Sequence, residues 1–218
     1  MSYKENVFED KSEITLIGQI MSEPELRYDE KDKFHYYEFT FDVFRKSLTI
    51  DKLQVRIKVD ILREIKPRLL DKYIIDGEIR SENKFNGKKR VLLIYVFASE
   101  VEEYIEESFI PNTIVNMFTN SGEIFGTTVK LGEYRKTPLG REIRDVLVAV
   151  NSILGYSYYI PCIMWGNLAR DPYEYFEVGK RVNFDGRLQS RTYDKQIDGM
   201  FQKMTAYEFS IKGIFEQL

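Results

Sequence analysis

The chain has little of what most catalytic and metal sites require. Its 218 residues include one cysteine, Cys162, one histidine, His35, and one tryptophan, Trp165. A single cysteine allows no internal disulfide, and a single histidine without clustered thiols argues against a Cys/His metal site. The sequence also has neither a phosphate-cradling glycine loop with its lysine nor a nucleophile motif. We therefore expect no enzyme activity and no cofactor.

Long hydrophobic runs and an excess of positive charge are also absent. No apolar run reaches the roughly 18 residues needed to span a bilayer, and residues 1–6 are polar, unlike a signal peptide. We expect a cytoplasmic protein without membrane contact. The net charge is −3; residues 1–110 carry 19 basic and 23 acidic residues, whereas residues 111–218 carry 13 and 12. The second half is therefore the more favourable partner for a polyanion.

A repeated dipeptide organises the chain. Asp76-Gly77 recurs as Asp185-Gly186, 109 residues later, and residues 73–81 match residues 182–190. Each stretch is typical of a strand, a glycine where the strand bends, and a second strand. The period is too long for a solenoid and suits one small domain. We predict two domains, at residues 1–110 and 111–218.

Hydrophobic alternation predicts the same element order in both copies. The first copy is expected to have strands at 13–20, 34–44 and 53–59, a helix at 61–70, and strands around 76–77 and at 91–98. The second is expected to have strands at 123–129, 143–150 and 158–165, a helix near 168–176, and strands at 181–193 and 200–211. This order describes an oligonucleotide/oligosaccharide-binding (OB) barrel. The predicted fold class is all-β, with two tandem five-stranded OB barrels, each with a short helix between its third and fourth strands.

Several segments resemble a known family. Gly18 and Ile20, followed by Pro-Glu-Leu-Arg-Tyr at 24–28, are similar to the first strand and loop of bacterial single-stranded-DNA-binding proteins. A second resemblance, to the third strand, helix and fourth strand of that family, is carried by residues 163–169, Tyr175, Gly179 and residues 185–193. The resemblance covers nearly the whole chain. It implies sequence-nonspecific binding of single-stranded DNA in replication, repair or recombination, in association with the nucleoid, and a homodimer that assembles four barrels.

Candidate DNA-binding residues concentrate in the second copy. Single-strand binding needs aromatic faces for bases and cations for phosphates. Along residues 158–165, one face carries Tyr159 and Trp165, and the other, with Cys162, is expected to fill the barrel. By resemblance, Tyr159, Trp165 and Tyr193 match aromatic stacking positions of the family. The candidate cations of this copy are Arg187 and Arg191, which share one side of a strand with Tyr193, and Arg135, Lys136, Arg141 and Lys195.

The first copy departs from this pattern. Its third strand is expected to turn Gln54, Arg56 and Lys58 outward, with no aromatic residue among them. Family stacking residues therefore cannot be transferred to this copy, although Tyr36 and Tyr37 are possible substitutes. Its candidate contacts are Arg56, Lys58, Arg80, Lys84 and Phe85. Two roles remain open for it: charge-based contact with the DNA backbone, or the dimer contact.

Each candidate also has a purely structural interpretation. A strand tryptophan is more often core or interface than a base platform, and Arg187 and Arg191 alone are typical of a solvated strand face. The main alternative function is an OB-fold interaction platform for replication or mobile-element proteins that has little nucleic-acid binding. Net acidity favours that alternative, and the aromatic set argues against it. An RNA-binding OB protein is a third hypothesis, because stacking does not distinguish the sugars.

The C-terminal residues bear on protein partners. Members of the resembled family commonly end in an acidic tip that recruits other proteins. Here Glu216 is the one acidic residue among the last ten. We therefore expect no recruitment through the C-terminus, and place any protein-interaction surface on the first copy or on the connector with Glu102, Glu103, Glu106 and Glu107.

Overall fold

A computed structural model describes residues 9–45, 47–65, 67–85, 87, 90–104, 120–172, 175–197 and 199–215. Glu106, Glu107 and Glu216, on which the expectations about partner recruitment depend, lie outside these residues. The first copy contains β1 (Lys11–Ile20), β2 (Glu25–Asp29), β3 (Phe34–Phe44), β4 (Ile50–Lys58), α1 (Val59–Ile65), β5 (Lys72–Phe85) and β6 (Arg90–Glu103). Its strand pairings form a closed ring in the order β1, β5, β6, β4, β3 and back to β1.

The second copy has the same ring of pairings. It contains β7 (Asn120–Lys136), β8 (Glu142–Asn151), β9 (Ser157–Trp165), α3 (Gly166–Arg170), β10 (Arg181–Ile197) and β11 (Met200–Ile214). The ring runs β7, β8, β9, β11, β10 and back to β7. Within the described part of the chain, β4–β6 and β9–β11 are the parallel pairs of the two rings. The predicted all-β fold with two tandem OB barrels is confirmed.

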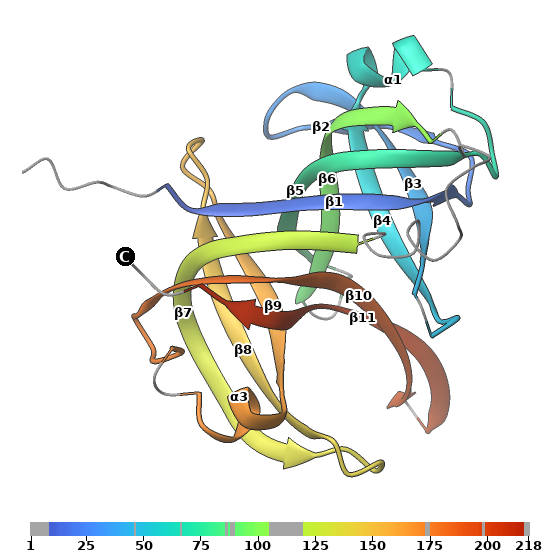
Figure 1. Ribbon diagram of the computed structural model, residues 1–218. Coiled ribbons are helices and arrows are strands. Elements are labelled where there is room, and N and C mark those ends of the chain that lie inside the picture. The colour runs from blue at the N-terminus through green and yellow to red at the C-terminus, as the bar shows by residue number, and fades with distance from the viewer. Residues whose placement is uncertain are drawn as a thin grey trace, which may run out of the picture.

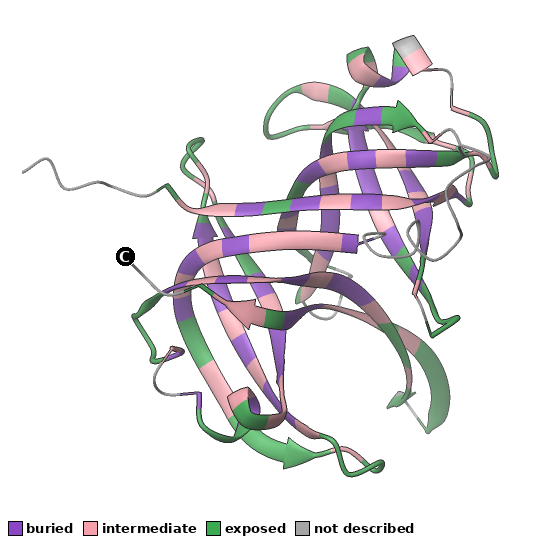
Figure 2. Ribbon diagram, viewed as in Figure 1, coloured by how far each residue is buried: buried purple, intermediate pink, exposed green. Residues whose placement is uncertain are grey.

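The alternation expected from the sequence fills both barrels. Buried residues alternate with more exposed ones along β1 and much of β7 (Figure 2). In β9, Ile160, Cys162 and Met164 are at most 2% exposed, so they face the interior as predicted. Burial raises the pKa of the Cys162 thiol well above its ordinary value, which keeps the thiol neutral.

The repeated glycines have a steric reason. The β5–β6 register shifts between Asp76 and Gly77, and the β10–β11 register shifts between Asp185 and Gly186. A Cβ atom on Gly77 would lie 2.4 Å from the Phe97 carbonyl oxygen, and one on Gly186 would lie 2.3 Å from that of Ser210. Each glycine therefore allows a strand to bend past its neighbour inside one continuous strand.

Three local expectations need correction. The α1 helix ends at Ile65, not at residue 70, and Pro67 follows; α3 ends at Arg170, not near residue 176, and Pro172 follows. Proline disfavours the helical conformation of the residue before it, so both helices end early. The segment after the first strand is not entirely loop, because β2 pairs with β3. No described helix has the length and apolar character needed to cross a membrane.

The two barrels are joined by a strand ladder. Antiparallel pairing of β1 with β7 runs from Lys11↔Phe125 to Leu16↔Asn120 and joins the described strands into an 11-stranded sheet (Figure 1). Ile14 pairs with Gly122, the residue 108 positions later that occupies the matching place in the second copy. The two copies are therefore related by an approximate two-fold axis through this pair, as in an isologous dimer contact.

Reciprocal hairpin contacts reinforce this symmetry. The backbone N–H of Lys52, after the β3–β4 turn, donates to the Ser190 hydroxyl at 2.9 Å. The backbone N–H of Tyr159, after the β8–β9 turn, donates to the Ser81 hydroxyl at 2.8 Å. Ser81 and Ser190 occupy matching places in the repeat, so each copy places one hairpin against the other copy.

Candidate nucleic-acid interface

The second barrel carries a long groove made of two adjoining clefts of about 1040 and 1070 Å³. The two clefts share Arg135, Arg191, Thr205 and Glu208, and we call them together the basic groove. Its walls come from the β7–β8 and β10–β11 hairpins, which extend beyond the barrel in Figure 1, and from the β3–β4 and β5–β6 hairpins of the first barrel.

Positive charge is concentrated in the basic groove. Among the described residues that line it, the acids are Asp145 and Glu208. Asp145 is paired with Arg135, with a shortest N–O distance of 2.5 Å. The basic residues of the groove are Arg45, Lys52, Arg90, Lys130, Arg135, Lys136, Arg141, Arg187, Arg191, Lys195 and Lys212. In a chain with net charge −3, this concentration of cations is complementary to a polyanion.

Three of the described aromatic side chains line the basic groove; Tyr207 packs against the core, and Trp165 and Tyr193 lie among the cations. Trp165 is half-buried, and its indole Nε1–H donates to the Ser210 hydroxyl at 2.9 Å, which orients the ring. Tyr193 projects from β10, and the guanidinium of Arg191 lies 5.4 Å from the centre of its ring. Half-exposed rings beside cations suit stacking of bases with contact to the adjoining phosphates.

Arg187 has an unusual environment. Its Nε is buried and has no hydrogen-bond partner among the described residues, and one NH2 group lies 3.4 Å from the Gln189 side-chain oxygen. Burial and, next, the positive charge of Arg45 lower the pKa of Arg187. An anion in the groove would satisfy this guanidinium.

The structure brings together eight of the nine second-copy candidates. These are Arg135, Lys136, Arg141, Trp165, Arg187, Arg191, Tyr193 and Lys195. Tyr159, 39% exposed, lies in another cleft, between the barrels. The sequence interpretation missed Lys130 and Lys212, which a count of basic residues on each strand would have included. It also missed Arg45, Lys52 and Arg90, which no sequence spacing assigns to the second barrel.

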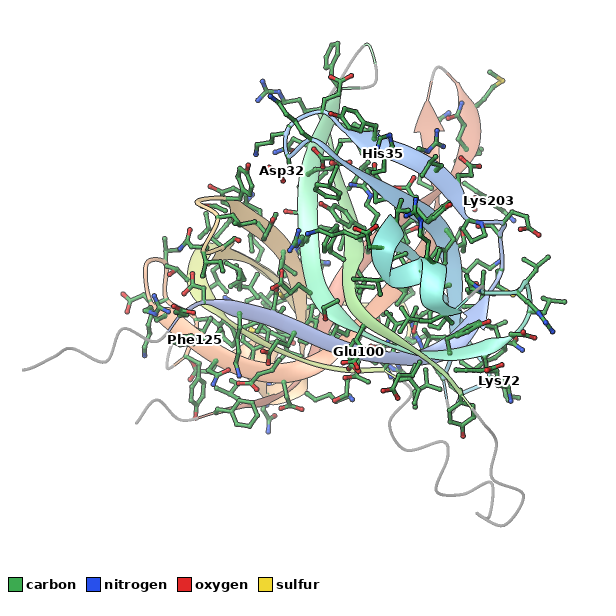
Figure 3. The ribbon with its side chains drawn as sticks, turned by 90° about the horizontal axis from the view of Figure 1, so that it is seen from above. Asp32, His35, Lys72, Glu100, Phe125 and Lys203 are labelled. Carbon is green, nitrogen blue, oxygen red and sulfur yellow. The ribbon has the colours of Figure 1, made fainter. Side chains whose placement is uncertain are left out.

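The cleft around Tyr159, which we call the junction cleft, is lined by many aromatic side chains, and several of them already contact a cation. The guanidinium carbon of Arg56 lies 3.8 Å from the ring centre of Tyr95. The ammonium nitrogen of Lys31 lies 3.3 Å from the ring centre of Tyr156. The Tyr156 hydroxyl donates to Asp32 at 2.6 Å; Asp32 is labelled in Figure 3. The aromatic residues of this cleft are Phe34, Tyr36, Tyr95, Phe97, Tyr156, Tyr158 and Tyr159. These contacts favour a structural joint between the barrels.

The first-copy candidates do not form a comparable site. Arg56 is 4% exposed and paired with Glu38 at 2.6 Å and Glu82 at 2.8 Å. Burial opposes its charge, but the hydrogen bonds to these two carboxylates outweigh that effect and raise the pKa of Arg56. Of the suggested substitutes, Tyr36 is buried and Tyr37 packs against the core. Arg80 pairs with Glu78, whereas Lys58, Lys84 and Phe85 are exposed.

Comparisons with known proteins agree with this geometry. Residues 119–214 match the single-strand binding protein family. Single-stranded DNA-binding protein 1 of Staphylococcus aureus (strain COL) and single-stranded DNA-binding protein 2 of S. aureus (strain MSSA476) are each 32% identical over 79 residues. Each alignment covers 34% of this chain and 47% of the relative, so the chain spans about half the length of the curated relatives that it matches.

The fold of the whole chain is found in a solved structure. The wild-type single-stranded DNA binding protein from Thermus aquaticus superposes with a TM-score of 0.69 at 14% identity, covering 97% of this chain and 95% of that chain. A deletion mutant of the same protein gives a TM-score of 0.67 at 15% identity, covering 96% of each chain. This likeness shows a shared two-barrel fold. Within that fold, it is residues 119–214 that resemble the single-strand binding protein family.

Proposed function

We propose that this protein binds single-stranded DNA without sequence preference, and acts without catalysis in replication, repair or recombination. The observation that supports this most is the basic groove, which combines Trp165 and Tyr193 with many cations in an acidic chain. We further propose that residues 111–218 form the main binding domain and residues 1–110 a divergent second domain.

The groove suggests how a strand is held. Cations from the hairpins that wall the groove contact the phosphates, and bases stack on the indole of Trp165 and the phenol ring of Tyr193. Stacking needs the faces of unpaired bases, which a duplex does not expose. Binding should therefore favour single strands. It should also weaken as salt is added: each neutralised phosphate contributes about 0.7 to the steepness of the plot of log affinity against log salt concentration.

Titration with an oligo-dT of about 30 nucleotides (dT30) tests the proposal, with the fluorescence of the single tryptophan as the signal. We expect quenching of Trp165, because a base stacked on the indole alters its emission. A duplex of equal length should bind much more weakly, and an oligo-rU of equal length tests the RNA alternative. Equal affinity for duplex and single strand would contradict the proposal.

A protein-interaction role remains the alternative for the first barrel. Its outermost strand, β2, exposes Leu26 and Tyr28, and the free edge of a strand can pair with another chain. Glu102 and Glu103, of the expected acidic surface, are exposed at the end of β6. We propose that this barrel contributes to a homodimer with four barrels and to protein contacts, in a cytoplasmic, nucleoid-associated protein.

A further inference from the structure

The basic groove is not built by the second barrel alone. Arg45 and Lys52, on either side of the β3–β4 turn of the first barrel, line the same cleft as Trp165 and Arg187. The two residues belong to the copy with the weaker family pattern and lie more than 100 positions before Trp165 and Arg187. Their presence makes the groove a property of the joined barrels.

A buried carboxylate holds this hairpin in place. Asp51 is fully buried and accepts a hydrogen bond from Nε of Arg45 at 2.6 Å. The same carboxylate accepts the backbone N–H of Ser190 at 2.7 Å, and the Ser190 hydroxyl accepts the N–H of Lys52 at 2.9 Å. Arg45 is thereby fixed against β10, the strand that carries Arg187.

Arg45 and Arg187 carry the same charge, but only Arg45 has a carboxylate hydrogen-bonded to its guanidinium among the described residues. Hydrogen bonding to Asp51 raises the pKa of Arg45, whereas burial and the charge of Arg45 lower that of Arg187. Nε of Arg187 has no partner among the described residues. Asp51 is hydrogen-bonded to Arg45 and acts on Arg187 only through its charge, so the two neighbouring guanidinium groups are stabilised when a further anion binds.

We propose that Arg45 and Arg187 form one phosphate site shared by the two barrels, which holds a phosphodiester of the bound strand beside Trp165. This inference rests on the proposed function and adds that the first barrel supplies part of the second barrel's site. Phosphate is the fitting ligand class, because its oxygens can accept hydrogen bonds from two guanidinium groups at once.

The decisive variant is Arg187→Gln in the full chain. It removes a cation that burial and the charge of Arg45 destabilise more than Asp51 stabilises it, so the thermal midpoint should stay at the parent value or rise. Affinity for dT30 should fall roughly tenfold, and the salt slope should decrease by about 0.7. Arg63→Gln is the matched control, because Arg63 is exposed on α1 outside the groove, and it should bind like the parent.

Arg45 needs a milder change, because Arg45→Gln would leave Asp51 buried without its cation. Arg45→Lys keeps the charge beside Asp51 and removes the planar fork that holds a phosphate. If the two residues share one phosphate, Arg45→Lys should weaken dT30 binding in the parent but add little in the Arg187→Gln background. Additive losses would show two separate contacts and overturn the shared site.

The outcomes separate the two proposals. If the parent protein binds dT30 and the Arg187→Gln variant binds it with equal affinity, the shared phosphate site is overturned and the proposed function stays intact. A lower thermal midpoint for Arg187→Gln would assign Arg187 to the fold and also overturn the inference. A parent that does not bind dT30 would overturn the proposed function itself, and the phosphate site with it.

Discussion

At the scale of single residues, the groove separates two aromatic candidates from the third. Trp165→Ala and Tyr193→Ala should each weaken single-strand binding by about 1–3 kcal/mol, because each removes one stacking face. Tyr159→Ala should cost less than either, since Tyr159 lies in the junction cleft. Anisotropy of labelled dT30 measures all three, with Tyr134→Ala as the control outside both clefts. Equal losses for the three variants would contradict this separation.

Asp42 provides a test of stability at the same scale. It is 3% exposed, its Oδ1 has no partner among the described residues, and burial, partly offset by Lys52, raises its pKa. Because the folded pKa lies above the ordinary value, the ionised group opposes folding at pH 7, and protonation removes that cost as the pH falls through the raised pKa. Asp42→Asn should therefore increase the free energy of unfolding at pH 7 by about 1 kcal/mol. Urea denaturation should show the gain shrinking towards pH 3; a gain independent of pH would refute the explanation.

At the scale of elements, the bends of β5 and β10 depend on their glycines. Gly77→Ala and Gly186→Ala place a Cβ within 2.4 Å of backbone oxygen, so each should lower the free energy of unfolding by about 1–3 kcal/mol or more. Gly132→Ala on β7 is the comparison, because its nearest neighbour would be 3.1 Å away. The measurement is urea denaturation of the full chain. A Gly132 variant as unstable as the other two would argue against the steric explanation.

At the scale of the whole molecule, the two barrels should contribute unequally to binding. The double variant Arg191→Gln with Lys195→Gln removes two cations from the basic groove. Lys58→Gln with Lys84→Gln removes two exposed cations from the first barrel. The first pair should weaken dT30 binding more and reduce the salt slope more, because its cations surround the aromatic residues. The opposite order would move the main site to the first barrel.

The oligomeric state belongs to the same scale. Pairing of β1 with β7 already covers one strand edge of each barrel within the chain, and the outer edge of β2 is one of the edges left for another chain. Light scattering of a homodimer should give twice the chain mass of 25.9 kDa. A monomer at micromolar concentration that binds dT30 tightly would refute the dimer.

Much of the fold could be predicted from the sequence. The repeated Asp-Gly and the period-two alternation predicted two barrels and the interior face of β9, because burial and steric crowding act on local pattern. The prolines that end α1 and α3 were visible in the sequence, but the apolar spacing beyond them suggested longer helices. Eight of nine second-copy candidates lie together because the strands that carry them are neighbours in one barrel.

The rest was decided by tertiary structure. Alternation shows which face of a strand a residue occupies, and it cannot show what covers that face. Arg56 is on the expected face but is enclosed by Glu38, Glu82 and Tyr95. The two-fold contact between the barrels carries Tyr159 into the junction cleft and brings Arg45 to Arg187. Local sequence pattern was enough for two barrels and for the strands that carry the charges. Which charges share a groove follows from the packing of one barrel on the other, because that packing joins residues far apart in the chain, such as Lys52 and Ser190.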